Sequence, residues 1–166
     1  MANCASQAAC SANLKPMPLQ PLLPASALAA NMADIKPPLR PQEAMVEASR
    51  CLFCFDAPCI MACPTGIDIP AFIKKIAFGN PAGAAKTILT ANILGASCAR
   101  VCPTQVLCEG ACVLEDRDEQ PIQIGRLQRY ATDYVEARGL RVLSAPATQS
   151  GKRVAVIGAG PRKSEA

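Results

Sequence analysis

Apolar residues recur at the spacing of an α-helix in four stretches of this chain, and strand patterns are almost absent. The first stretch, residues 42–50, follows Pro41 and carries Ala44, Met45 and Ala48. Proline is favoured at the first position of a helix, and the three apolar residues predict one buried face. The pattern therefore predicts a helix over residues 42–50.

The next three helices have recognisable starts or stops. Asp68 is a candidate N-cap, and Gly79 is a candidate stop before another helix over residues 81–92. The last helix begins near Pro121 and stops at Gly139. The apolar faces of these helices are predicted to form the core: Phe72, Ile73, Ile76, Ala84, Ala85, Ile88, Leu89, Ile122, Ile124, Leu127, Tyr130, Ala131, Tyr134 and Val135.

The beginning of the chain has no such periodicity. Residues 1–40 are built mainly from Ala, Pro, Ser, Leu and Asn, and we expect them to form a flexible or loosely docked leader. With 166 residues in total, the chain then has room for one helical domain, residues 41–146. No run of 18 or more apolar residues is present, so we expect no membrane span.

Eight of the ten cysteines lie in two runs between residues 51 and 112. The first run is Cys-x2-Cys-x4-Cys-x3-Cys-Pro, and the second is Cys-x3-Cys-Pro-x4-Cys-x3-Cys. Thiols packed this densely, with a proline directly after a cysteine, have a spacing close to that of bacterial ferredoxins. The runs predict two [4Fe-4S] clusters, held in loops whose free N–H groups hydrogen-bond the sulfurs.

Disulfide formation and zinc binding are alternative roles for these cysteines, and both stay open at this point. Disulfides need an oxidising compartment, but the first 30 residues hold a single cation, Lys15, and their apolar stretch is broken by prolines. Only the Ala-x-Ala pattern at Ala27 and Ala29 is typical of a signal peptide. Eight cysteines can also fill two Cys4 zinc sites, which would make the chain a non-catalytic interaction module. We adopt the iron–sulfur interpretation and a cytoplasmic location, where thiols stay reduced.

The formal net charge of +4 does not indicate a nucleic-acid partner. Ligating cysteines are ionised, and two clusters with mostly thiolate ligands bring the total charge close to neutral. We therefore expect neither nucleic acid nor a membrane as a partner.

The end of the chain carries a different signal. A basic start and the apolar residues 154–157 lead into Gly158 and Gly160, which is the opening of a dinucleotide-binding fold. Lys163 stands where the third glycine is due, and the sequence stops at Ala166. We expect residues 147–166 to hold a linker and the first strand of a truncated Rossmann-type FAD-binding domain.

Much of the chain resembles the N-terminal helical domain of dihydropyrimidine dehydrogenases, most nearly the bacterial subunit that uses FAD and NAD. The resemblance is carried by residues 48–54, 57–59, 62–70, 102–104, 107–112 and 124–133. The small subunit of glutamate synthase shares the cysteine frame and is the nearest rival. That relative typically carries a glutamate in the stretch around Gln128, so Gln128 favours the pyrimidine enzyme. The resemblance implies a mainly α fold, namely an alpha-helical ferredoxin-like domain with two iron–sulfur clusters.

The resemblance also implies which side chains bind each cluster. One cluster would be held by Cys51, Cys54, Cys59 and Cys112. The other would be held by Cys63, Cys102, Cys108 and the side-chain oxygen of Gln128. Cys98 is then a free, buried thiol. Spacing alone predicts that all eight cysteines are cluster ligands, so Cys98 as the eighth thiolate ligand stays the alternative.

In enzymes of this kind NAD(P)H reduces FAD in later domains, and electrons pass singly through the clusters to a flavin site where uracil or thymine is reduced. The resemblance therefore implies an electron-transfer domain whose partner is an FMN-containing, pyrimidine-reducing subunit or domain. The cofactors carry this chemistry, so no side chain here is expected to be catalytic. Residues 1–166 lack the FAD and NAD regions and should not turn over substrate alone.

Overall fold

In the computed structural model the described residues are helical and contain no strand. This confirms the mainly α fold for that part of the chain. The described residues are 23–34, 36–117, 119–145, 147–148, 151–153 and 155. Gly158, Gly160 and the predicted strand, apart from Ala155, lie outside them, as do residues 1–22 of the leader.

The chain divides into two compact units, Met1–Ile35 and Lys36–Ala166. The first unit contains helix α1, Ala25–Asn31, in which no residue is buried. The leader shows no apolar periodicity in the sequence, yet this stretch is helical. Its sequence follows Pro24 and contains four alanines in seven residues, and alanine is the residue with the highest helix propensity.

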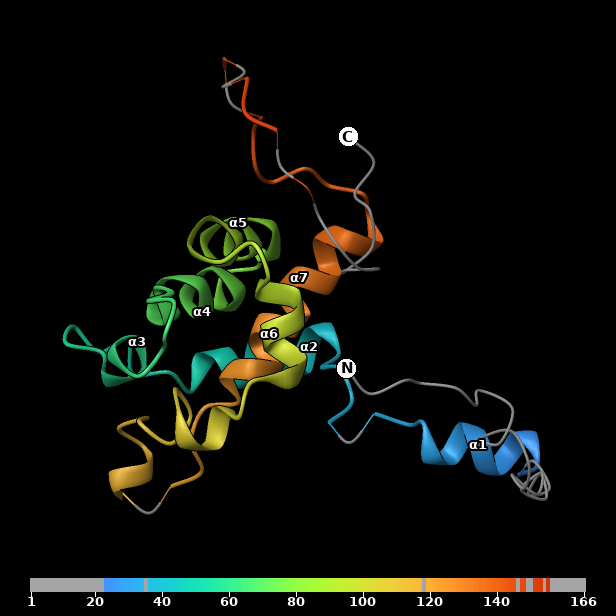
Figure 1. The fold of residues 1–166 in the computed structure, drawn as a ribbon. Coiled ribbons are helices and arrows are strands. Elements are labelled where there is room, and N and C mark those ends of the chain that lie inside the picture. Colours follow the sequence, from blue (N-terminus) through green and yellow to red (C-terminus); the bar gives the residue numbers. More distant parts are fainter. Residues whose placement is uncertain are drawn as a thin grey trace, which may run out of the picture. The chain divides into compact units, whose positions relative to one another are not determined.

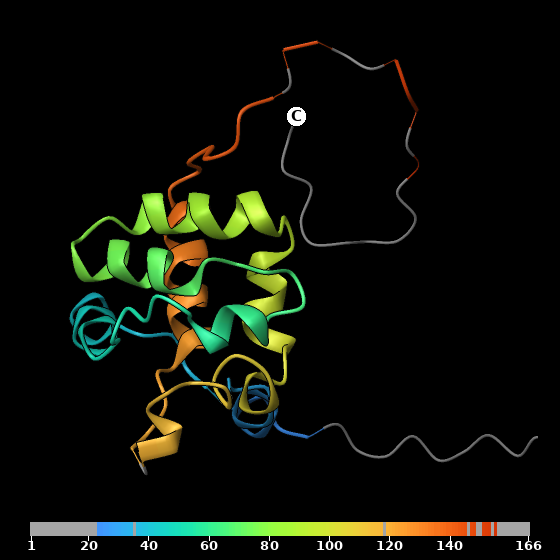
Figure 2. The same ribbon diagram turned by 90° about the vertical axis from the view of Figure 1, so that its left-hand side faces the viewer.

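The second unit is built around helix α7, Ile124–Ala137, which contacts helices α2, α4, α5 and α6 (Figures 1 and 2). Their bounds are α2 Pro41–Ser49, α3 Pro58–Met61, α4 Ile69–Ala77, α5 Pro81–Ala91 and α6 Gly95–Val101, with short 3-10 helices at η1 Thr104–Val106 and η2 Glu115–Arg117. The four helices predicted from the sequence are α2, α4, α5 and α7. None of the helices in the described part of the chain has both the length and the apolar character needed to cross a membrane.

Local signals set the ends of two of these helices. Asp68 accepts the N–H of Ala71 at 3.0 Å, which confirms it as the N-cap of α4. Gly139 follows α7 with a φ of +59°, and the N–H of Leu140 donates to the carbonyl oxygen of Val135 at 2.9 Å. This is the Schellman arrangement, in which a left-handed glycine ends a helix.

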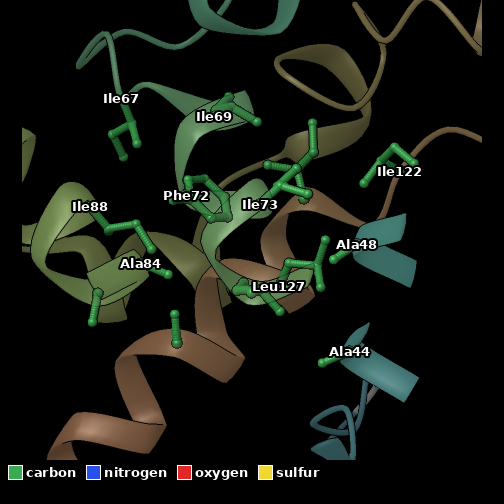
Figure 3. Close-up of a cluster of buried hydrophobic side chains, with 14 of the residues drawn as sticks. Ala44, Ala48, Ile67, Ile69, Phe72, Ile73, Ala84, Ile88, Ile122 and Leu127 are labelled. Carbon is green, nitrogen blue, oxygen red and sulfur yellow. The ribbon is translucent and has the colours of Figure 1, made fainter. Parts of the chain in front are cut away.

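The core fills the space between α7 and the helices around it (Figure 3). Its main buried residues are Ala44, Ala48, Ile67, Ile69, Phe72, Ile73, Ile76, Ala84, Ala85, Ile88, Leu114, Ile122, Ile124, Leu127, Ala131 and Val135. Met45 was also predicted for the core, but it is 45% exposed. Ala44 and Ala48 lie one turn apart on the inner face of α2, and the residue after Ala44 is rotated away from that face.

Several cysteines belong to the edge of this core. Partly buried residues packed against it include Cys51, Cys59, Cys63, Cys108 and Cys112. The hydrophobic core and the cysteine region are therefore continuous.

Candidate iron–sulfur site

Cys51, Cys54, Cys59 and Cys112 line one pocket of the helical unit. Three of them come from the first cysteine run, and Cys112 arrives from the end of the second run. The rest of the wall is mainly apolar: Leu52, Ala57, Pro58, Ile69, Pro70, Ala111, Val113, Leu114, Ile122 and Ile124. The structure thus gathers the four thiols that the resemblance assigns to one cluster. Their role as ligands stays a prediction.

The surroundings of these thiols make their ionisation unfavourable when no positive charge is bound between them. Burial, and then repulsion from Cys51 and Cys112, raises the pKa of the Cys59 thiol to about 11. Burial also raises the pKa of Cys51, although a hydrogen bond from the N–H of Phe53 favours its thiolate. A bound iron cluster supplies the positive charge that lets such thiols ionise together.

Phe53, which contacts Cys51 in this way, has an unusual backbone. Its φ of +51° lies in the left-handed region, which costs a residue other than glycine about 1–2 kcal/mol. In this conformation its N–H bonds the Cys51 sulfur. The sequence did not identify this residue, because no residue pattern in the loop predicts a phenylalanine with a left-handed backbone.

Cys63, Cys98, Cys102 and Cys108 form a second group of interacting thiols. Burial, then Cys98 and Cys63, raises the pKa of Cys102. Burial, then the charges of Glu109 and Cys63, raises the pKa of Cys108 to about 12. Cys63 acts on both Cys102 and Cys108, and Cys98 acts on Cys102, so the structure brings the three predicted ligands and Cys98 close together. Cys98 is half-buried and not fully buried as the sequence suggested.

The turn after Cys63 points several donors at its sulfur. The hydroxyl of Thr65 lies 3.4 Å from Sγ, and the N–H groups of Thr65, Gly66 and Ile67 also reach it. Burial alone would raise the pKa of Cys63, but these hydrogen bonds outweigh burial and hold the pKa below its usual value. Gly66 closes the turn with a φ of +61°. The predicted hydrogen bonding of a sulfur by loop amides is present here.

The prediction that the thiols lie on loops is wrong for two of them. Cys59 is on α3 and Cys98 is on α6. Cys102 follows α6 with an extended backbone, φ −64° and ψ 137°, as expected for a residue that precedes proline. The short helix α6 is possible here because it is held by contacts with α7 rather than by its own propensity.

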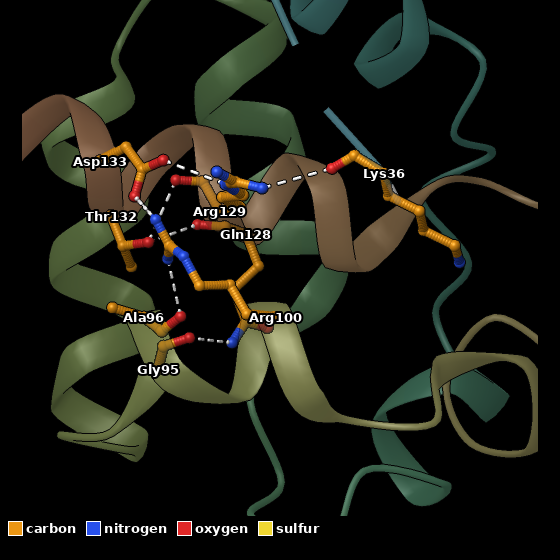
Figure 4. A network of polar contacts seen from close by, with 8 residues as sticks. All are labelled: Lys36, Gly95, Ala96, Arg100, Gln128, Arg129, Thr132 and Asp133. Atoms are coloured by element: carbon orange, nitrogen blue, oxygen red, sulfur yellow. Dashed lines mark hydrogen bonds and ion pairs between the residues drawn. The ribbon is translucent and has the colours of Figure 1, made fainter. Parts of the chain in front are cut away.

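Gln128 lies on the buried face of α7, beside the start of α6 (Figure 4). Its Nε2 donates to the carbonyl oxygen of Gly95 at 2.7 Å. This bond occupies the nitrogen side of the amide, so Oε1 is left as an acceptor or ligand. A Cβ at Gly95 would stand 2.5 Å from Cγ2 of Ile88 on α5, so the glycine lets the start of α6 lie close to α5. The orientation of the amide fits the oxygen-ligand role implied for Gln128.

A second contact between α6 and α7 lies one turn further along (Figure 4). Arg100 on α6 pairs with Asp133 on α7 at 2.6 Å, and Arg129 also contacts Asp133 at 3.3 Å. Arg129 in turn donates to the carbonyl oxygen of Lys36 at 3.2 Å. The pairing keeps α6, and with it Cys98, against the helix that carries Gln128.

Two buried carboxylates cap the start of α7, and sequence analysis missed both. Glu109 accepts the N–H of Gly125 at 3.0 Å, and Glu47 accepts the N–H of Gln123 at 2.9 Å. The positive end of a helix dipole stabilises such charges. Glu109 directly follows Cys108, so its cap ties the second thiol group to α7. Gly125 lies 16 positions from Glu109, and Gln123 lies 76 positions from Glu47. Both separations are too long for a local sequence pattern to reveal the contact.

The donor set fits an iron–sulfur cluster. Thiolates are the soft ligands that such clusters use, and the sulfurs here receive N–H donors from the surrounding backbone. In the part of the chain that the structure describes, no three Cys, Asp or Glu side chains converge where a single metal ion would bind. The ligands of a four-iron cluster need not converge in this way, because each binds a different iron.

A small helical unit with two groups of thiols defines an iron–sulfur domain. Residues 28–140 match the family described as dihydropyrimidine dehydrogenase domain II, 4Fe-4S cluster. The match covers well over half of the chain, and the chain belongs to this family.

Three relatives indicate how far this likeness extends. The chain is 49% identical over 128 residues to the NAD-dependent dihydropyrimidine dehydrogenase subunit PreT of Escherichia coli O157:H7, covering 77% of this chain and 31% of the relative. PreT of Escherichia coli strain K12 is 52% identical over 118 residues, which cover 71% of this chain and 28% of that relative. The glutamate synthase [NADPH] small chain of Halomonas elongata is 39% identical over 138 residues, which cover 83% of this chain and 29% of that relative.

The chain therefore spans only about 30% of the length of these curated relatives. It is an iron–sulfur domain that is similar to part of PreT and to part of the glutamate synthase small chain.

Proposed function

We propose that this chain is the electron-transfer segment of an NAD(P)H- and FAD-dependent oxidoreductase that reduces uracil or thymine, as a dihydropyrimidine dehydrogenase does. The observation that carries the proposal is the gathering of Cys112 with Cys51, Cys54 and Cys59 around one pocket. When bound, the clusters supply one-electron centres between FAD and a second flavin site. The chain's own residues hold the sulfurs, donate N–H groups to them and surround them with apolar side chains.

Two ligand sets belong to this proposal. Cys51, Cys54, Cys59 and Cys112 hold one [4Fe-4S] cluster. Cys63, Cys102, Cys108 and Oε1 of Gln128 hold the other. The buried position of Gln128 and the bond from its Nε2 to Gly95 support an oriented oxygen ligand. A neutral oxygen in place of a thiolate makes the second cluster one unit less negative, which favours its reduction.

The proposal also assigns the rest of the chain. Residues 41–146 form the two-cluster domain, residues 1–40 a leader, and residues 147–166 the start of an FAD-binding domain with Gly158 and Gly160 at the dinucleotide. The relatives named PreT are subunits of a dehydrogenase, which supports a protein partner for this chain. We propose that the partner is FMN-containing and that both work in the cytoplasm, where thiols stay reduced.

A second candidate function is that of a glutamate synthase small chain, favoured by 39% identity over 83% of this chain. The identity with PreT is higher, at 49% and 52%, and supports the pyrimidine enzyme. The two functions are distinguished by joining this chain to its FAD region and partner and measuring the oxidation of NADH and of NADPH, first with uracil and then with glutamine and 2-oxoglutarate.

The first experiment is to measure iron, acid-labile sulfide and zinc per chain after anaerobic expression and reconstitution. We expect about eight irons and about eight sulfides, the sum of two four-iron clusters, with visible absorbance that dithionite bleaches. About two zinc ions without sulfide would refute the proposal and leave a structural module.

A further inference from the structure

Glu109 is a buried acidic residue in the turn that carries Cys108. Its exposed fraction is 8%, and it directly follows Cys108 in the chain. Its backbone N–H donates to the carbonyl oxygen of Thr104 at 2.9 Å, and Thr104 lies two residues after Cys102. Glu109 therefore joins the segments that carry two of the proposed ligands of the second cluster.

The carboxylate of Glu109 reaches the helix that carries a third proposed ligand of this cluster. Its Oε1 accepts the N–H of Gly125 at 3.0 Å, at the start of α7. A Cβ at Gly125 would stand 3.5 Å from this oxygen and 3.1 Å from Cγ2 of Thr104, so the start of α7 packs closely here. Gln128 follows three residues later on a neighbouring part of the helix surface, about 4.5 Å along the axis. The carboxylate is therefore close to both Cys108 and Gln128.

The charge of Glu109 is not balanced by a basic side chain. Glu47, the other buried carboxylate at the start of α7, pairs with Arg50 at 2.9 Å. Among the described residues, no lysine or arginine forms a salt bridge with Glu109. The partial positive charge at the start of α7 balances its negative charge only in part. Because the site is buried, water and salt screen this charge weakly.

We propose that Glu109 lowers the reduction potential of the second cluster, which Cys63, Cys102, Cys108 and Gln128 would hold. The inference rests on the proposed function, in which these residues are ligands. Reduction adds one negative charge to a cluster, and a fixed negative charge nearby makes that step less favourable. The neutral ligand Gln128 acts in the opposite direction, so the two side chains together set the potential.

The test is a redox titration, followed by electron paramagnetic resonance, of the cluster-loaded 166-residue chain and its variants. Glu109→Gln removes the charge and keeps an oxygen that can accept the N–H of Gly125. We expect unchanged iron and sulfide, with the potential of the second cluster shifted to a higher value. Gln128→Cys identifies this cluster, because the added thiolate lowers its potential.

Glu109→Met repeats the test if the glutamine variant does not take up its clusters. Methionine has a side chain of similar length without the charge or the acceptor. The variant should be less stable, because the start of α7 loses its cap, but its potential should shift in the same direction.

Glu115→Gln is the matched control, because it makes the same substitution three residues after Cys112 at an exposed position. Water and salt screen an exposed charge, so both potentials should stay unchanged. An equal shift in this variant would overturn the inference, since the shift would then follow the net charge of the chain.

Three other results separate the inference from the proposed function. A second-cluster potential that does not rise in the Glu109 variants, with full iron content, would overturn the inference while the proposed function stands. Loss of iron from both Glu109 variants would also overturn it, because Glu109 would then be needed to build the site. A wild-type chain that takes up no iron and sulfide would refute the proposed function and the inference with it.

Discussion

Gln128 is the residue on which the second ligand set depends, because it is the one proposed ligand that is not a cysteine. We predict that Gln128→Ala loses one cluster, so that iron falls from about eight to about four per chain. Gln128→Cys should keep both clusters and lower one potential, since a thiolate adds negative charge. Iron and sulfide analysis with redox titration measures both effects.

The matched control is Gln123→Ala, which removes an amide at the N-cap of the same helix. It should keep the full iron content. If Cys98 is the eighth ligand, the pattern reverses: Gln128→Ala keeps its iron and Cys98→Ala loses it. The pair of variants therefore decides between the two ligand sets that the sequence left open.

At the scale of the element, Gly110 closes the turn between Cys108 and Cys112. A Cβ at this position would overlap the backbone carbonyl oxygen of Gln105, so the turn cannot accept a side chain without moving its backbone. We predict that Gly110→Ala displaces both flanking thiols and reduces the iron of both clusters, with a loss of more than about 2 kcal/mol in stability. Iron content and thermal unfolding measure the two effects.

Gly139→Ala is the control for this variant, because the space around Gly139 is open and only its φ of +59° resists a side chain. Its cost should be about 1–2 kcal/mol, with no loss of iron. Equal iron content in the two alanine variants would contradict the role given to Gly110.

The cap of α4 gives a smaller, local prediction. Asp68→Ala removes the acceptor for the N–H of Ala71 and should lower the stability of the loaded chain by about 1 kcal/mol. Asp68→Asn keeps an acceptor oxygen and should lose only a few tenths of that. Thermal unfolding followed by circular dichroism tests this, and identical losses in both variants would rule out the cap as the cause.

The residues at the helix ends show which parts of the fold could be predicted from the sequence. Asp68 and Gly139 are local signals, so the start of α4 and the end of α7 are readable from sequence alone. Helix α6 is not, because it begins at Gly95, a poor helix former, and is held instead by Gln128 and the pairing of Arg100 with Asp133. Its contacts come from more than 30 residues away, where no periodicity reaches.

The candidate site was predictable to a similar extent. The cysteine spacing identified the chemistry, because thiols this dense have few uses. Spacing could not divide eight cysteines into two sets, since Cys112 joins the first run only through the fold. The contact of Glu109 with Gly125 was also out of reach, because a glutamate in a loop has no distinctive pattern.

At the scale of the whole molecule, the thiols and the core form one structure. The buried core relies heavily on alanine and isoleucine with a single phenylalanine, and five partly buried cysteines pack against it. Each alanine buries little apolar area, so the hydrophobic stabilisation of a core with this composition is modest. Bound clusters would bridge α2, α3 and α7 with the loops between them, and metal binding in such small domains contributes directly to folding.

We therefore predict that removing the clusters with an oxidant and a chelator unfolds much of the helical unit. The far-ultraviolet circular dichroism signal of the helices should fall sharply and return when iron and sulfide are restored. Gln128→Ala, with one cluster remaining, should show an intermediate loss and serves as the graded control. A cluster-free chain that keeps its full helical signal and a cooperative unfolding transition would contradict this prediction. The cysteines would then attach their clusters to a core that is already folded, and the clusters would have an electronic role alone.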